Sequence, residues 1–183
     1  ARAFAESIVS AGAFTMAPAA GGALEYLAAG SVDVRGLINM SDVLPGRLPN
    51  PVSPDAGFNS RVGPILVNGS DQGAASHSRV LLHGADAEPV RLIALAGDVT
   101  GPANAQDGAS TLGIFPKPAL IVAGRDVRNV WLLNQNLRDD DVTIVRAGRD
   151  VVFDPLRDAR TGEQKDNDGR IQIGGPGRLE VIA

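Results

Sequence analysis

Residues 119–127 read Ala-Leu-Ile-Val-Ala-Gly-Arg-Asp-Val, and residues 143–151 read Thr-Ile-Val-Arg-Ala-Gly-Arg-Asp-Val. The two stretches share the core Ala-Gly-Arg-Asp-Val, which places Gly124 and Gly148 24 residues apart. Looser copies surround Gly30 and Gly97, and residues 179–183, Leu-Glu-Val-Ile-Ala, match the first half of a further copy. A period in the twenties with a short strand in each period is typical of a stacked solenoid.

The repeated strands alternate between inward and outward side chains. Aligned on the shared glycines, the inward residues are Ile121, Ala123, Val145 and Ala147, and the glycine after each alanine forms a corner. Such a corner needs either a positive φ or a tight approach of neighbouring coils, and glycine permits both. The predicted corner residues are Gly30, Gly97, Gly124 and Gly148, and the predicted turn acids are Asp126 and Asp150, which should stack.

These features predict an all-β fold, a right-handed parallel β-helix with coils of about 22–25 residues. Like residues then lie above like, so Asn134, Gln135 and Asn136 are candidates for amide ladders at a corner. With coils of that length the chain has room for roughly six to eight, less the residues that loops consume. The alternative architecture is an ordinary β-sandwich in which the repeat arose by chance.

Two segments interrupt the repeat. The first, residues 41–57, contains four prolines, which cannot donate ladder hydrogen bonds, and the second, residues 154–170, is charged and poor in apolar residues. We expect both to be loops that leave the solenoid. Nothing marks a domain boundary, so residues 1–183 are predicted to form a single β-helical segment, which we expect to belong to a larger protein.

Composition narrows the classes of function. Aromatic residues make up only 4% of the 183 residues, whereas 22 glycines and 12 prolines suit many short strands. A net charge of −4 offers no basic surface for nucleic acid, and the absence of cysteine excludes disulfides and thiolate metal sites. No apolar run approaches the roughly 18 residues of a membrane span. The first twenty residues lack the pattern of a signal peptide, so we interpret them as mature chain.

Several polar motifs were considered as metal sites. His77 and His83 are six residues apart and would share one face of a continuous strand, but a metal site needs a third ligand. We interpret them as a surface histidine and a strand-end histidine. Residues 164–169 and 174–179 resemble calcium-binding loops, but Gln164, Gly175 and Leu179 occupy positions where those loops need acidic residues. Both segments are interpreted as turns.

The acidic residues were considered as glycosidase groups. The candidates are Asp139, Asp140, Asp141, Asp154 and Asp158. A glycosidase needs two carboxyl groups roughly 5 to 9.5 Å apart across a bound sugar. We interpret these residues as solvated loop charges, and we expect no catalytic, cofactor-binding or metal-binding residue in the chain.

Several of these motifs resemble the later part of large filamentous-haemagglutinin-like exoproteins. The resemblance covers about residues 14–183 and rests on the Ala-Gly-Arg-Asp-Val copies and on residues 27–30, 40–42, 48–51, 134–137, 142–147 and 174–181. It implies a right-handed parallel β-helix that forms the shaft of a secreted or surface-exposed adhesin of Gram-negative bacteria. It also implies export by a dedicated outer-membrane transporter of the two-partner-secretion type, and it supplies no catalytic residues.

The expected function is therefore a non-catalytic shaft segment that contributes to attachment to host cells or surfaces. A host glycan or receptor is a possible partner, and no cofactor, nucleic acid or membrane span is expected. The alternatives are a polysaccharide-acting β-helix enzyme and a glycan-binding module. The scattered aromatic residues, such as Tyr26 and Trp131, disfavour both, because sugar binding uses clustered aromatic side chains.

Overall fold

The computed structural model describes residues 1–16, 18–42, 51–52, 81–102, 111–157, 160–165 and 169–183. Every regular element in these ranges is a β-strand. Three parallel sheets contain almost all of the strands. The first sheet contains β1 (Arg2–Ala3), β4 (Glu25–Ala28), β7 (Val90–Ala94), β10 (Ala119–Ala123), β13 (Val142–Ala147) and β18 (Arg178–Ile182). The second contains β2 (Ile8–Ser10), β5 (Val32–Val34), β8 (Val99–Thr100), β11 (Val127–Arg128) and β14 (Val151–Val152). The third contains β3 (Phe14–Met16), β6 (Ile38–Met40), β9 (Thr111–Phe115), β12 (Trp131–Gln135) and β17 (Ile171–Gly174).

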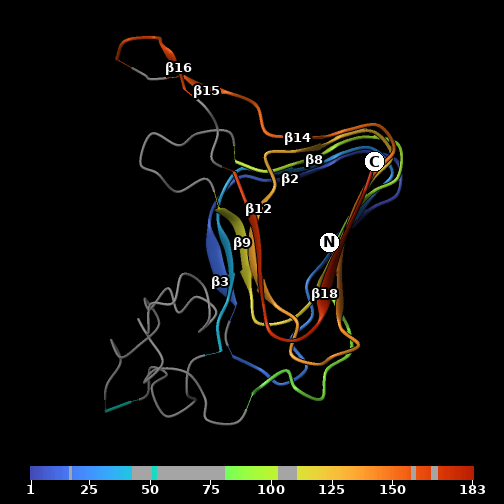
Figure 1. The fold of residues 1–183 in the computed structure, drawn as a ribbon, viewed down its shortest axis with the longest axis vertical. Helices are drawn as coiled ribbons and strands as arrows, with labels where there is room; N and C mark the ends of the chain where they lie inside the picture. The colour runs from blue at the N-terminus through green and yellow to red at the C-terminus, as the bar shows by residue number, and fades with distance from the viewer. Residues whose placement is uncertain (17, 43–50, 53–80, 103–110, 158–159, 166–168) are drawn as a thin grey trace.

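The chain visits the three sheets in a fixed order. It passes from the first to the second to the third sheet five times, and β18 begins a sixth visit to the first sheet. Figure 1 shows the sheets as the three sides of a triangle, with β14, β8 and β2 along one side and β18 on another. The predicted all-β parallel β-helix is confirmed.

The repeat aligns as the sequence predicts. Between β10 and β13, Ile121 pairs with Val145 and Ala123 pairs with Ala147. On the second sheet, Val127 pairs with Val151. Strands β7 and β10 alternate strictly between buried and partly exposed residues, because successive side chains point to opposite faces of a sheet. The buried residues form one hydrophobic core of mainly valine, leucine, isoleucine and alanine side chains inside the triangle.

Both predicted loops fall in intervals between strands of successive sheets, and residues 43–50 and 53–57 of the first and 158–159 and 166–168 of the second lie outside the described residues. The first predicted loop, 41–57, falls within a longer interval, residues 41–89, between β6 and β7. The second, 154–170, falls between β14 and β17 and contains a two-stranded antiparallel hairpin of β15 (Leu156–Arg157) and β16 (Gln164–Lys165). Figure 1 places this hairpin outside the triangle of sheets.

The predicted amide ladder is wrong. Asn134 lies between Phe115 of β9 and Ile173 of β17, so the neighbouring coils carry apolar residues at that position. Asn134 Nδ2 instead donates to Thr143 Oγ1 at 2.6 Å, and Thr143 Oγ1 donates to Asn136 Oδ1 at 2.8 Å. The Asn134 and Asn136 amides therefore bond to Thr143 within one corner rather than forming a column of amides along the solenoid axis.

Candidate functional site

Two corners of the triangle contain the residues of interest. The repeat corner joins the first sheet to the second, at residues 29–31, 95–98, 124–126 and 148–150. The return corner leads from the third sheet back to the first, and it includes Gly22, residues 81–89, residues 116–118 and residues 136–141. The repeat in the sequence predicts the repeat corner, but it does not predict the side-chain contacts of the return corner.

Close packing explains the glycines of the repeat corner. A Cβ atom on Gly124 would lie 2.2 Å from the backbone oxygen of Leu95, and one on Gly148 would lie 2.2 Å from the backbone oxygen of Gly124. Neither residue has a positive φ. Of the two reasons predicted for glycine at the corner, the tight approach of neighbouring coils is therefore the one that applies.

The four predicted corner glycines occupy two rows rather than one. Gly30 and Gly97 stand two residues before the valine that opens the second sheet, and the Gly97 N–H donates to the Gly30 oxygen at 3.1 Å. Gly124 and Gly148 stand three residues before their valines. Arg125 takes the place next to Gly97, since its N–H donates to the Gly97 oxygen at 3.0 Å. The looser sequence copies are thus displaced by one residue from the two close copies.

A ladder of polar side chains runs along the repeat corner just before the valines. Ser7 Oγ accepts the N–H of Ser31 at 2.9 Å, and Ser31 Oγ accepts the N–H of Asp98 at 3.1 Å. Asp98 Oδ1 then accepts the N–H of Asp126 at 3.0 Å. Each side chain accepts a hydrogen bond from the backbone of the next coil, which links the coils in register.

The two predicted turn acids have different surroundings. Asp126 is buried and accepts two hydrogen bonds from Arg149, from Nε at 3.0 Å and from Nη2 at 2.7 Å. These hydrogen bonds hold the pKa of Asp126 below its ordinary value, despite some desolvation, and they raise the pKa of Arg149. Asp150 occupies the equivalent place in the next coil and is exposed. Asp126 therefore serves as an ionised structural partner of an arginine.

Three of the other acidic candidates contact arginines. Asp141 is buried, and its carboxylate accepts hydrogen bonds from the Arg138 backbone at 3.0 Å and from Arg138 Nη2 at 2.7 Å. Asp140 Oδ1 lies 3.2 Å from Arg138 Nε, and Asp154 pairs with Arg128. The structure thus gives these three carboxylates arginine partners instead of pairing them across a space for a sugar.

Other sequence candidates lie partly outside the described residues. His77, Asp158 and residues 166–168 of the first calcium-like motif are among these. Residues 174–179 form a tight turn between β17 and β18, with a φ of 93° at Gly175. Among the described residues, no group of three or more histidine or acidic side chains is placed to hold a metal ion.

A buried cluster of three ionisable side chains lies in the return corner. Lys117, in the turn between β9 and β10, has a side chain that is only 1% exposed. Its Nζ donates hydrogen bonds to the Asp86 carboxylate and, at 3.1 Å, to the backbone oxygen of Gly22. The His83 side chain is also 1% exposed, and its Nδ1 lies 3.5 Å from Asp86 Oδ2. The interpretation of His83 as a strand-end residue is wrong, because it lies in a turn and is buried.

The environment separates the protonation states of the three groups. Burial and the nearby positive charge of Lys117 lower the pKa of His83, although Asp86 acts in the opposite direction. Burial acts to raise the pKa of Asp86, but hydrogen bonds from Lys117 and the Glu88 backbone outweigh it, so the pKa lies below its ordinary value. The cluster therefore combines a lysine–aspartate ion pair with a neutral imidazole. Neither imidazole nitrogen makes a hydrogen bond within the described part of the chain.

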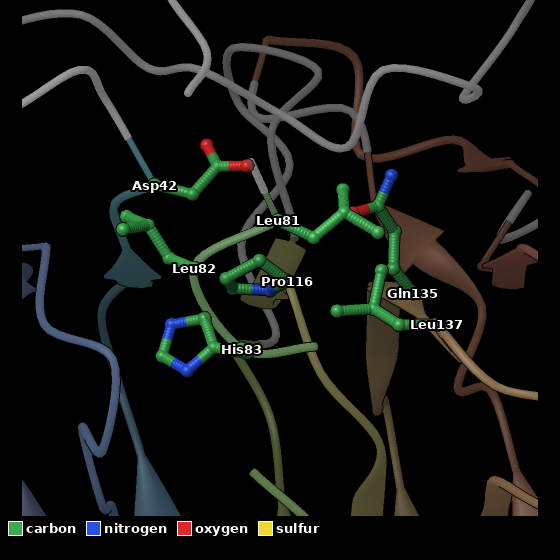
Figure 2. Close-up of a pocket in the computed structure, with 7 residues that line it drawn as sticks. All are labelled: Asp42, Leu81, Leu82, His83, Pro116, Gln135 and Leu137. Atoms are coloured by element: carbon green, nitrogen blue, oxygen red, sulfur yellow. The ribbon is translucent and has the colours of Figure 1, made fainter. Parts of the chain in front are cut away.

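A small pocket adjoins this cluster. Its empty space is about 160 Å³, including space open to solvent, and its lining residues are Asp42, Leu81, Leu82, His83, Pro116, Gln135 and Leu137. Figure 2 shows Leu82 and His83 on one side and Gln135 and Leu137 on the other. The walls combine apolar side chains with Asp42, His83 and Gln135, so this pocket gives solvent a partial approach to one side of the cluster.

One sequence signal pointed to this site. Lys117 is one of only two lysines in the chain, and it follows the apolar run Leu-Gly-Ile-Phe-Pro and precedes Pro-Ala-Leu-Ile-Val. A lysine inside an apolar stretch is expected to have a partner, because burying an unpaired charge is strongly unfavourable. Nothing in the sequence pattern identified Asp86 and His83 as that partner and its neighbour.

The described residues contain no helix that is long and apolar enough to span a membrane. No protein-family model, no curated protein and no solved structure matches this chain.

Proposed function

We propose that this chain is a structural shaft segment of a secreted or surface-exposed filamentous adhesin, and that it is not catalytic. The observation that supports this most directly is the continuous parallel register of three coils on the first sheet. Val90–Ala94 pairs residue by residue with Ala119–Ala123, and Leu120–Ala123 pairs in the same way with Ile144–Ala147. A stack of this kind grows by adding coils, each adding about 4.8 Å, and length of this kind is what a shaft needs.

The repeat corner also supports a structural role. Its serine and aspartate ladder and its arginine pairs join each coil to the next. The acidic side chains that an enzyme would need for glycan cleavage pair with arginines, as Asp126 and Asp141 do. These arginine pairs favour a structural role for Asp126 and Asp141 over a role as a general acid or base.

The resemblance to filamentous-haemagglutinin-like exoproteins adds an export route and a class of partner to the proposal. On that resemblance the shaft is exported by an outer-membrane two-partner-secretion transporter and places a binding region at a distance from the cell. The partner at the far end would be a host glycan or receptor. The contribution of this segment to attachment is then indirect, through length and rigidity.

In-frame deletion of one coil in the parent protein, in bacteria that display it, tests this proposal. Removing residues 119–142 takes out β10, β11 and β12 and joins Pro118 to Thr143, which pairs in register where Ala119 had been. A shaft tolerates this change, so we expect an unchanged surface amount and unchanged attachment to epithelial cells. The surface amount is measured with an antibody, and attachment is counted per cell.

Two results would contradict the proposal. Loss of attachment at an unchanged surface amount would mean that this segment itself carries the ligand site, as a glycan-binding module does. Release of sugar from acidic polysaccharides by the purified chain, abolished by Asp140→Asn or Asp141→Asn, would mean that the segment is an enzyme.

A further inference from the structure

The return corner brings a lysine amine and a carboxyl group into direct contact in a largely buried site. Lys117 Nζ donates to the Asp86 carboxylate, and their side chains are only 1% and 12% exposed. The Gly22 oxygen accepts a second hydrogen bond from Nζ at 3.1 Å and fixes its direction. Holding two reacting groups in contact in this way replaces an encounter in solution by a step within one molecule, which greatly accelerates bond formation.

The pair is charged, because hydrogen bonds from Lys117 and the Glu88 backbone outweigh the effect of burial on the pKa of Asp86. Removing an ammonium and a carboxylate from water is unfavourable, and their attraction offsets that penalty only with good geometry and further hydrogen bonds. A reaction that neutralises both groups at once removes the penalty. Condensation to an amide is such a reaction, because the amide product carries no charge.

We propose that Lys117 and Asp86 become joined by an intramolecular amide bond between Nζ and Cγ. The ammonium first passes a proton to the carboxylate, and the neutral Nζ then attacks Cγ. The Nζ–Cγ bond forms, one Cγ–Oδ bond breaks, and the oxygen leaves as water with the two protons that the ammonium has lost. No group is oxidised or reduced, and no further reactant is needed.

His83 is positioned to move the proton in this step. Its Nδ1 lies 3.5 Å from Asp86 Oδ2, and no hydrogen bond within the described residues occupies either ring nitrogen. Its lowered pKa keeps the imidazole neutral and able to accept a proton near pH 7. The proton lost from Nζ during attack passes to the imidazole and returns to the leaving oxygen. A side chain placed for general acid–base catalysis accelerates such a step about 100-fold or more.

The bond would close a ring around one coil. Lys117 and Asp86 are 31 residues apart, and β7, β8 and β9 lie between them. The segment that returns from the 41–89 interval would then be fixed covalently to the corner that opens the next coil. A covalent bond at this place would resist force applied along the shaft. Whether the bond exists can be tested independently of the proposed function.

The mass of the intact purified protein under denaturing conditions is the decisive measurement. We expect the protein to be lighter than its sequence by one water molecule. The chain contains only the lysines Lys117 and Lys165, so two variants assign the bond. Lys165→Arg should keep the deficit and Lys117→Arg should abolish it. A wild-type mass equal to that of the sequence, or a deficit that survives Lys117→Arg, overturns the proposal.

Digestion after arginine and before unmodified aspartate locates the bond. These cleavages release residues 92–106, so the linked product joins residues 80–91 to residues 107–125 and cannot be an uncleaved linear peptide. Asp86→Asn should form the same bond with loss of one ammonia molecule instead of water. Asp86→Ala should show no deficit, and a deficit in Asp86→Ala would assign the bond to another carboxyl group and overturn the proposal.

The role of His83 is tested by the rate at which the deficit appears when chains that have never folded, isolated from inclusion bodies, are refolded. His83→Gln keeps a neutral polar side chain but does not take up a proton. We expect the linked fraction to form about 100-fold more slowly in this variant. An unchanged rate would remove His83 from the mechanism. The wild-type mass decides the existence of the bond even if this variant folds poorly.

Discussion

The repeat corner and the return corner join strands of the same solenoid, yet they are built on different principles. At the repeat corner, side chains in equivalent positions stack coil after coil, as Ser31, Asp98 and Asp126 do. At the return corner, residues of different types and from different segments meet once, as Lys117 meets Asp86. The repeated contacts of the repeat corner can be continued by each added coil. The Lys117–Asp86 contact of the return corner instead occurs at one position along the stack.

Breaking the buried ion pair should have the largest effect. Lys117→Met removes the partner of the largely buried Asp86 carboxyl group, whether the two are paired as ions or joined by the proposed amide bond. Removing one partner of a buried pair destabilises by about 3–5 kcal/mol. Urea denaturation followed by circular dichroism measures this loss. The double variant Lys117→Met/Asp86→Leu should recover more than half of it, because no charge is then left uncompensated.

The other lysine supplies the control for this prediction. Lys165 belongs to the hairpin β15–β16, outside the triangle of sheets, so Lys165→Met should leave the urea midpoint nearly unchanged. Equal losses in Lys117→Met and Lys165→Met would mean that the return corner contributes no specific stability.

Crowding the repeat corner should have the next largest effect. Gly148→Val places a side chain against the backbone oxygen of Gly124, which cannot move without disturbing the coil before it. Forcing extra atoms into a packed site costs about 1–3 kcal/mol. Gly12→Val is the matched control, since a Cβ atom there meets nothing within 4 Å. If both variants lost the same stability, close packing would not be the reason for glycine at Gly148.

The pH dependence of the free energy of unfolding tests the burial of His83 in the return corner. The pKa of His83 is lowered in the folded chain, so the unfolded chain binds the proton more readily. Stability should therefore be complete above the ordinary histidine pKa of 6.5 and should fall as the pH decreases below it. His83→Gln should remove this step, and His77→Gln should retain it. If the step vanished in His77→Gln instead, His77 would be the titrating group and the assignment to His83 would be wrong.

The smallest effect is expected for substitutions of the turn acids, Asp126 and Asp150. Asp126→Asn weakens the double hydrogen bond from Arg149, whereas Asp150 is exposed, so Asp150→Asn should lower the melting temperature less than Asp126→Asn does. The pKa of Asp126 is lowered in the folded chain, so its contribution should decrease as the pH falls below the ordinary value of 3.8 and through the lower folded value. Melting curves of the two variants at pH 7 and pH 3 measure both effects. A difference between the variants that did not decrease from pH 7 to pH 3 would contradict the ion-pair explanation.

The repeat predicted the pairing of the close copies correctly, but it did not predict the neighbours of Asn134. The pairing of Ile121 with Val145 and of Val127 with Val151 was predicted from the shared glycines, because identical motifs in successive coils must stack. The same reasoning failed for Asn134, whose neighbours on the third sheet are Phe115 and Ile173. The sequence of the third sheet does not repeat from coil to coil at this position, so unlike residues lie above one another there.

The sequence by itself determined the parallel β-helix, the register of its close repeats and the need for glycine at the repeat corner. These features are periodic, and a period in the sequence becomes a neighbour relation in the stack. Only the tertiary structure decided that Lys117 meets Asp86 and His83. Those partners depend on where the chain returns from the 41–89 interval, and that segment carries no repeat from which its position can be predicted. The burial of a charge is a property of the surroundings, and the surroundings exist only once the coils have packed.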